Sequence, residues 1–174
     1  MIIAANKVDR PKGKENFERI KKEFDCPVVA CFAEGELALR EADKAGLIDY
    51  VPGASEFKEE EGLTDKQREA LEGVKKIIGE FGSTGVQEVL NKVILEVLDM
   101  IAIYPAGDKL ADSKGNILPD CYLLKNGSTA LDFAERIHSD LAKDFIKAID
   151  VRSKQARGKE YKLKMGDGLE IITK

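Results

Sequence analysis

Histidine, cysteine and tryptophan are scarce in this sequence, which has one histidine, three cysteines and no tryptophan. Cys26, Cys31 and Cys121 form no CxxC pair and no cluster with His138, so we expect neither a metal site nor a disulfide framework. We interpret the cysteines as reduced core thiols. No serine or cysteine is arranged with His138 for nucleophilic catalysis, and we expect this histidine to cap or pack at a helix end.

Long apolar runs are also missing. No stretch approaches the roughly 18 apolar residues that a membrane helix needs. Residues 1–5 lack both the basic flank and the length of a signal peptide. We therefore expect a cytoplasmic protein that makes no membrane contact.

The remaining composition is that of an ordinary globular protein. The chain has 174 residues, of which 43% are hydrophobic and 34% are charged, and its formal net charge is -4. This length suits one large domain or two small ones. The acidic excess lies within residues 1–96, whereas the rest of the chain is nearly neutral, which hints at two modules.

The first 46 residues alternate between apolar runs and helical patterns. Runs at 1–5 and 27–32 predict short buried strands, and amphipathic patterns at 16–24 and 34–45 predict a helix after each strand. This order predicts a parallel α/β sheet. Two parallel strands cannot cover both of their own faces, so we expect Met1 to fall inside a larger α/β domain.

Residues 47–100 predict a helical connection. We expect a solvated loop up to residue 62, and Thr64 with Gln67 then forms a capping box that starts a helix. Residues 82–85 break that helix. Thr84 is the predicted cap of a long second helix, residues 85–100, whose apolar positions recur at spacings of three and four and need a large partner surface.

Residues 101–174 predict an α+β module. A helix is expected from Ser128 or Thr129 to about His138, and a turn at 112–116. Strands are expected at 101–104, 121–124, 145–151, 161–164 and 169–173. A sheet of about four strands crossed by one helix is a module of sensible size.

The tetrapeptide Asn6-Lys7-Val8-Asp9 has the form NKxD and follows the first apolar run directly. An ionised carboxylate only accepts hydrogen bonds, and the edge of guanine offers two adjacent donors, so one carboxylate selects guanine through a bidentate pair. Adenine would leave one carboxylate oxygen facing a lone pair. A charged turn after a strand gives the same four residues by chance, and the tetrapeptide alone leaves that alternative open.

Several longer segments match a known pattern in detail. They are AEGELALR at 33–40, GSTGVQ at 82–87, NILPD at 116–120, GSTALDFA at 127–134, Ile137-His138, and FIKA at 145–148. With the NKxD motif, they resemble archaeal Obg-family (Obg/DRG-related) GTP-binding proteins over nearly the whole chain. The C-terminal segments resemble a TGS domain, which is a β-grasp fold.

The resemblance implies a fold and its boundaries. The expected parts are an α/β remnant of a P-loop GTPase domain at 1–46, a helical segment at 47–100, and an α+β β-grasp (TGS) domain at 101–174.

The resemblance also implies a site for the guanine of GTP or GDP. Asp9 would select the base, the Asn6 amide would tie the surrounding loops together, and the stem of Lys7 would cover the purine face. The backbone N–H of Ala33 would approach the guanine carbonyl oxygen. Phe32 stands where such proteins usually carry a serine.

A TGS domain is thought to contact RNA or the ribosome, and a basic segment near the C-terminus supplies candidates for such a contact. The candidates are Arg152, Lys154, Arg157, Lys159, Lys162 and Lys164. Lysines that protect an exposed strand edge from pairing are an equally good explanation of this segment.

The sequence has no GxxxxGK[ST] phosphate loop. The DxxG strings at 43–46 and 112–115 fit a helix end and a turn. We therefore expect Mg²⁺ binding and GTP hydrolysis only in a complete parent protein, and not in this chain alone. Two alternatives are a non-catalytic TGS binding module and an oligomerising fragment whose strands pair between chains.

Overall fold

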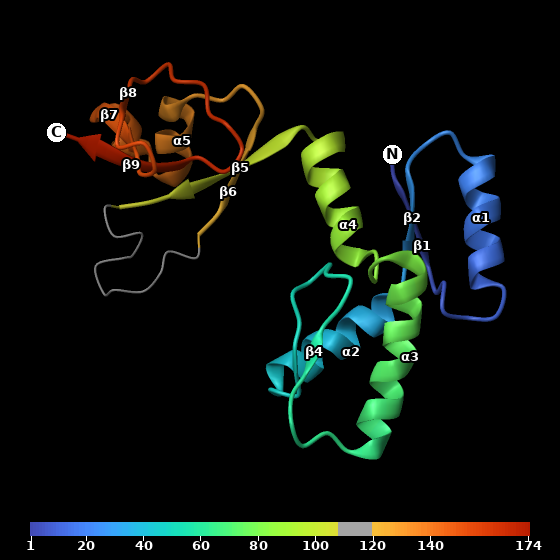
Figure 1. The fold of residues 1–174 in the computed structure, drawn as a ribbon. Helices are drawn as coiled ribbons and strands as arrows, with labels where there is room; N and C mark the ends of the chain where they lie inside the picture. Colours follow the sequence, from blue (N-terminus) through green and yellow to red (C-terminus); the bar gives the residue numbers. More distant parts are fainter. Residues whose placement is uncertain (108–119) are drawn as a thin grey trace. The chain divides into compact units, whose positions relative to one another are not determined.

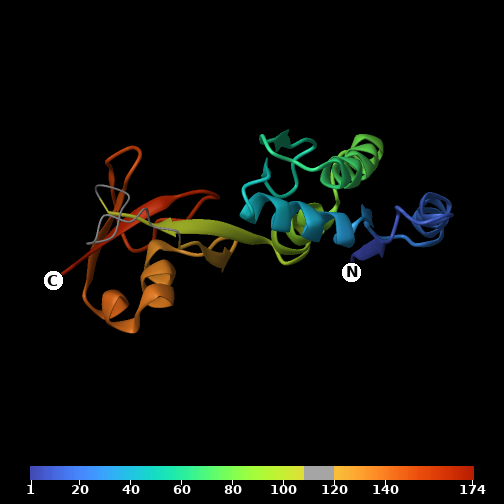
Figure 2. The same ribbon diagram turned by 90° about the horizontal axis from the view of Figure 1, so that it is seen from below.

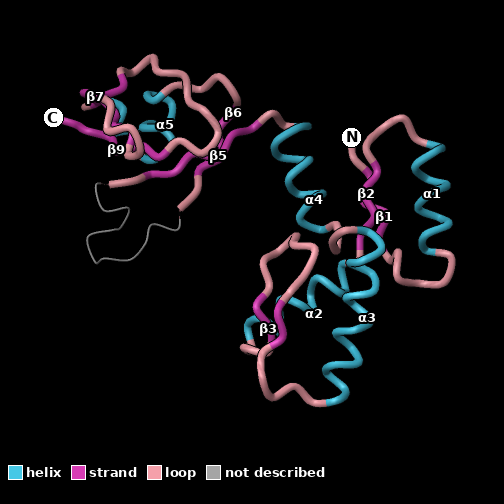
Figure 3. Tube along the Cα trace, in the orientation of Figure 1, coloured by secondary structure: helices cyan, strands magenta, loops and turns pink. Residues whose placement is uncertain are grey.

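The computed structural model describes residues 1–107 and 120–174. It contains two compact units, Met1–Val93 and Ile94–Lys174, each with a hydrophobic core of its own (Figures 1 and 3). The turn predicted at 112–116 and the DxxG string at 112–115 lie outside the described residues. Within those residues, no helix is both long enough and apolar enough to cross a bilayer.

The first unit begins with two parallel strands, β1 (Ile3–Asn6) and β2 (Val28–Cys31), joined through helix α1 (Gly13–Glu23). This confirms the predicted strand–helix–strand order. The register pairs Asn6 with Cys31, so the carboxyl ends of the two strands lie side by side (Figure 1).

Helix α1 is attached to the rest of the unit at its side. The Phe17 ring meets the Phe81 ring of helix α3 (Asp65–Phe81) edge to face, with centroids 6.1 Å apart. Lys14 also pairs with Glu80 of α3. No residue of α1 is fully buried, so this helix is held by contacts along one side.

The core of the first unit lies between helix α2 (Ala33–Lys44), helix α3 and a short antiparallel hairpin, β3 (Ile48–Asp49) and β4 (Lys58–Glu59). Its buried apolar residues are Leu39, Ile48, Tyr50, Leu63, Leu71, Val74 and Ile78. The prediction of a solvated loop at 47–62 is therefore wrong, because Ile48 and Tyr50 anchor that segment in the core. The division into three parts at residues 46 and 100 stays a proposal.

Of the two helix caps predicted in residues 47–100, the structure has one and lacks the other. Thr64 and Gln67 form the predicted capping box of α3, which is confirmed. Thr84, however, caps no helix: the N-cap of helix α4 (Val86–Asn91) is Gly85, whose φ is 77°. The hydroxyl of Thr84 instead donates a hydrogen bond to Glu36.

The long helix predicted at 85–100 is shorter than expected. After α4, a π-helical segment η1 (Lys92–Val97) follows, and Asp99 adopts a positive φ of 49° before strand β5 (Met100–Pro105) starts. No residue of α4 or η1 is fully buried, and part of the apolar stripe is exposed. The exposed members are Leu90, Leu95, Val97 and Leu98.

The second unit is a five-stranded sheet of order β6-β5-β9-β7-β8. The remaining strands are β6 (Tyr122–Lys125), β7 (Phe145–Asp150), β8 (Ala156–Arg157) and β9 (Gly168–Thr173). Helix α5 (Ala130–Ile137) lies against one face of this sheet (Figure 2), where Phe133 is fully buried. The predicted β-grasp arrangement of one helix on a mixed sheet is confirmed.

Two further predictions are wrong in part, one on a strand of the second unit and one on the cysteines of the chain. Residues 161–164 form no strand and contribute only a bridge from Lys162 to Thr129, because the chain pairs earlier, through β8. Of the three cysteines, Cys31 is buried, Cys26 is half-buried and Cys121 is exposed, so the prediction of core thiols holds fully only for Cys31.

The lone histidine and the first DxxG string have the structural roles expected of them. His138 ends α5, and its ring nitrogen accepts a hydrogen bond from the backbone N–H of Asp140 at 3.2 Å, which caps the short helix α6 (Ser139–Lys143). The string at 43–46 ends α2, where Gly46 has a φ of 70°.

Candidate functional site

The tips of β1 and β2 are joined by one side chain. Asn6 ends β1, and its Oδ1 accepts a hydrogen bond from the backbone N–H of Ala33, the first residue of α2, at 3.1 Å. The loop after β1 and the turn after β2 are therefore fixed to each other, as the NKxD pattern implied for its asparagine.

The loop that follows β1 folds tightly. Lys7 has a left-handed backbone with a φ of 68°, and the N–H of Val8 donates to the carbonyl oxygen of Cys31 at 3.3 Å. A side chain at Gly13 would place its Cβ 2.5 Å from the carbonyl oxygen of Lys7, so only glycine allows this approach. Val8 is buried, its neighbour Lys7 is exposed, and Asp9 on its other side is half-buried.

The Asp9 side chain lies at the surface of this loop, 16% exposed, with its Oδ2 3.2 Å from Nε of Arg10. Arg10 also donates to Glu34 of α2 at 2.9 Å. Asp9 is thus half-buried, whereas the Arg10 side chain is 59% exposed, so the guanidinium is free to move away and leave Asp9 to another donor. Neither Arg10 nor Glu34 was identified from the sequence, because a surface ion pair leaves no pattern.

Cavities open on both sides of Asn6. One, of about 210 Å³, is almost wholly apolar, with Cys31, Val86 and Leu90 in its lining beside Asn6 and Ala33. The other, of about 370 Å³, lies between β1 and α1, and its rim carries Lys7 and Arg10. Asn6 and Lys7 thus border space large enough to admit part of a ligand, whereas Asp9 is not part of the lining of either cavity.

The role expected of Ala33 stays a prediction. Its N–H is donated to Asn6 in this structure, so a contact with a guanine carbonyl would require Ala33 to share or exchange that bond. Lys7 is exposed and can move over a ligand.

A buried polar cluster next to these loops was missed from the sequence. Glu36, 4% exposed, accepts hydrogen bonds from three side chains on separate segments. The donors are Arg40 Nε at 2.7 Å, the Tyr50 hydroxyl at 2.8 Å and the Thr84 hydroxyl at 2.5 Å. The signal available was the Thr84-Gly85 pair in the predicted helix break, which we interpreted as a cap.

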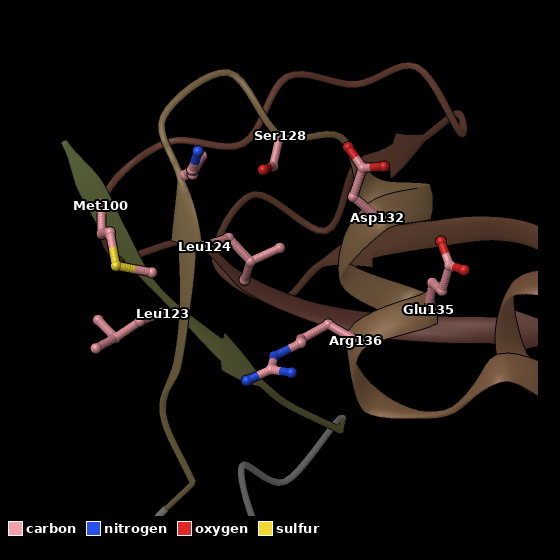
Figure 4. A pocket seen from close by; sticks show the side chains of 8 residues that line it. Met100, Leu123, Leu124, Ser128, Asp132, Glu135 and Arg136 are labelled. Atoms are coloured by element: carbon pink, nitrogen blue, oxygen red, sulfur yellow. The ribbon is translucent and has the colours of Figure 1, made fainter. Parts of the chain in front are cut away.

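The second unit has an open groove of about 590 Å³ at the edge of its sheet (Figure 4). Met100, Leu123 and Leu124 supply its apolar side from β5 and β6, and three charged side chains project from α5. Those three are Asp132, Glu135 and Arg136, and Lys125 and Ser128 complete the lining. Two acidic and two basic groups balance, so the groove favours no ligand of one charge.

The basic segment divides into residues with structural contacts and residues that face solvent. Arg157 lies over the Tyr161 ring, 4.7 Å from its centroid, and near Asp150, while Lys162 donates to the carbonyl oxygen of Gly127 at 2.6 Å. All members of the segment except the half-buried Arg157 are exposed. The structure therefore gives Arg157 and Lys162 a part in packing the domain.

Two family models match this chain. The model of the G4 motif-containing domain of YGR210-like, Obg-like GTPases matches residues 4–108, and the TGS domain model matches residues 101–173. The first matched region includes the strand tips described above, and the second includes the sheet with α5.

Relatives show the same likeness along the chain. The GTP-binding protein MJ1332 of Methanocaldococcus jannaschii is 44% identical over 176 residues, which cover 99% of this chain and 45% of that protein. The GTP-binding protein C428.15 of Schizosaccharomyces pombe is 32% identical over 142 residues, covering 74% and 34% of the two chains. This chain thus spans less than half the length of these relatives.

Two solved structures are similar to this chain. A GTP-binding protein from Pyrococcus horikoshii superposes with a TM-score of 0.68 at 37% identity and covers 99% of this chain and 45% of that one. The YchF GTPase of Schizosaccharomyces pombe, at 14% identity, shows the fold alone, with a TM-score of 0.53 and coverage of 98% and 42%.

Proposed function

Because the chain belongs to the YGR210-like group of Obg-like GTPases and carries a TGS domain, we propose that its strand tips recognise the base of a guanine nucleotide, GTP or GDP. The observation that carries the proposal is the hydrogen bond from Ala33 to Asn6, which holds the NKxD loop and the turn after β2 together. Asp9 lies on that loop with its carboxylate reachable from solvent.

Asp9 is the proposed selector of the base. Its two oxygens accept hydrogen bonds from the ring N–H and the exocyclic amine of guanine. These charge-assisted bonds replace the ion pair between Asp9 and Arg10. Lys7 is proposed to cover the purine face with its stem.

The proposal is limited to recognition of the base. Phosphate binding, Mg²⁺ and hydrolysis of GTP need a phosphate loop and metal ligands that this sequence does not hold. Such chemistry is proposed only for a complete parent GTPase. This chain alone is then expected to bind GDP weakly, with a Kd on the order of millimolar. Each tenfold change in Kd corresponds to about 1.4 kcal/mol of binding free energy.

Substitution Asp9→Asn tests the proposal by reversing one hydrogen bond. The amide of asparagine donates where the carboxylate accepted, so GDP binding should weaken by about tenfold or more, and xanthosine diphosphate, which has an acceptor in place of the amine, should bind better. Nitrogen–proton correlation spectra of the labelled chain, titrated with each nucleotide, measure both affinities.

Asp25→Asn is the matched control, because it makes the same charge change on an exposed loop before β2. It should leave both affinities unchanged. Equal GDP affinity in wild type and Asp9→Asn would remove Asp9 from the site. If neither nucleotide shifts a resonance, the chain is a TGS binding module without nucleotide recognition.

For the second unit we propose contact with RNA or the ribosome, in a role near translation that implies a cytoplasmic location. The TGS match and the exposed cations Arg152, Lys159 and Lys164 support this. Binding to ribosomal RNA should weaken steeply as salt is raised, since phosphate contacts release counterions. Filter binding across a salt series measures it, and undetectable binding at low salt would contradict it.

A further inference from the structure

Glu36 is a charged side chain placed where burial is expensive. It lies one turn into α2, is 4% exposed, and receives hydrogen bonds from Arg40, Tyr50 and Thr84. Removing a partner from a buried carboxylate strongly destabilises the fold. A well-packed apolar residue would hold the same segments together without the free-energy cost of burying a charge. Packing of the core alone therefore does not explain this choice of residue.

The hydrogen bonds keep the carboxylate ionised. Burial alone would raise the pKa of Glu36, but the hydrogen bonds from Thr84, Arg40 and Tyr50, with the charge of Arg40, outweigh it and hold the pKa below its ordinary value. The acceptor is thus in place at neutral pH.

Thr84 forms one hydrogen bond to the Glu36 carboxylate and another to the turn after β2, and so links the two. Its hydroxyl donates to Glu36 at 2.5 Å, and its carbonyl oxygen accepts from the N–H of Phe32 at 2.8 Å. The next residue, Gly85, lies so close to β2 that an added Cβ would stand 1.8 Å from the carbonyl oxygen of Ala30. Residues 84 and 85 therefore contact the backbone of residues 30–32, which leads into Ala33.

We propose that Glu36 and Thr84 are positioning residues for guanine recognition. Their hydrogen bond holds residues 82–85 against the turn between β2 and α2 and so keeps the N–H of Ala33 aimed at Asn6. Guanine affinity then depends on a contact between residues 48 positions apart. The inference rests on the proposed function, since it concerns the same strand tips.

Thr84→Val tests it by removing the hydroxyl while keeping the shape of the side chain. GDP affinity of the full chain should fall by about tenfold, the size expected for a hydrogen bond to a charged group. Hydrogen exchange at the Phe32 and Ala33 amides, measured without nucleotide, should accelerate by a similar factor. Thr84→Ser restores the hydroxyl and should restore both values.

Thr64→Val is the matched control, because it removes a threonine hydroxyl from the same unit, at the start of α3. It should lower the melting temperature while leaving GDP affinity and exchange at Ala33 at their wild-type values. If Thr84→Val does not fold, Tyr50→Phe removes another donor to Glu36 and should shift both readouts in the same direction.

The outcomes separate the two proposals. Wild-type GDP affinity and exchange in folded Thr84→Val, or equal losses in Thr64→Val, would overturn the positioning role. Absence of GDP binding in the wild-type chain would overturn base recognition and the positioning role that depends on it. The exchange rates would then still report whether Thr84 holds the turn.

Discussion

Cys31, the last residue of β2, is protected both by its position and by its chemistry. It is buried, and its thiol lies 3.7 Å from the carbonyl oxygen of Val29. Burial, together with the negative charge of Glu88, raises the pKa of this thiol to about 11. Because the thiolate is the reactive species, Cys31 should stay protonated and inert through neutral pH and gain reactivity only as the pH approaches 11. Cys121, in contrast, is exposed.

Alkylation at pH 8 should therefore separate these cysteines. We expect Cys121 to react at the rate of an ordinary thiol and Cys31 to react at least about a hundredfold more slowly, because a pKa of about 11 leaves far less thiolate at that pH. Mass spectrometry of peptides after timed treatment with iodoacetamide measures both rates. In a chain that carries Cys26→Ser, Cys121→Ser should abolish the fast phase, and rapid labelling of Cys31 in the folded chain would contradict its burial.

Among the elements, helix α3 and the start of α4 contain glycines with opposite requirements. Gly79 lies in α3, and an added Cβ would meet nothing within 4 Å. Gly85 has a φ of 77° and lies against the backbone of Ala30. Glycine is thus dispensable at the first position and required at the second.

Gly79→Ala and Gly85→Ala form a matched pair of substitutions. Alanine at 79 should stabilise the first unit by about 0.5–1 kcal/mol, the difference between glycine and alanine inside a helix. Alanine at 85 should destabilise it by about 2–4 kcal/mol, because it adds left-handed strain and an overlap with Ala30. Urea unfolding measures both, and a neutral Gly85→Ala would show that the contact with β2 is not close.

The elements predicted correctly are those whose signals are local. The capping box at Thr64 places the start of α3, and of the two predicted caps Ser128 and Thr129 it is Thr129 that starts α5, in each case with partners within three residues. The helix predicted at 85–100 is correct only in part, because α4 ends at Asn91 and Met100 already pairs with Lys125 in the sheet. A long-range ladder overrides a local period, and the sequence does not show it.

The candidate site divides in the same way. The position of Asn6 beside the turn after β2 could be predicted, because the NKxD motif is contiguous and parallel strands bring their carboxyl ends together. The bond from Ala33 to Asn6 could not, since the N–H of Ala33 was expected to approach a guanine carbonyl instead. Glu36 could not, because a glutamate on a helix is ordinarily exposed and its partner Thr84 comes from a distant segment.

At the scale of the whole molecule, each unit has its own core. Leu39 and Ile78 are among the buried residues of the first, and Phe133 and Ile103 among those of the second. Both units are within the size range of domains that fold alone. The two cores share no residue, so damage to one should leave the other intact.

Leu39→Ala and Phe133→Ala test this separation. Each removes a fully buried side chain from one core, at an expected loss of about 2–5 kcal/mol. For units of this size that loss lowers the unfolding midpoint by about 10 °C or more. Melting followed by resolved amide signals should show Leu39→Ala lowering the midpoint of residues 1–93 alone and Phe133→Ala that of residues 94–174 alone. Equal shifts of both midpoints in either variant would mean that the units unfold as one cooperative body, and recognition at the strand tips would then depend on the integrity of the TGS domain.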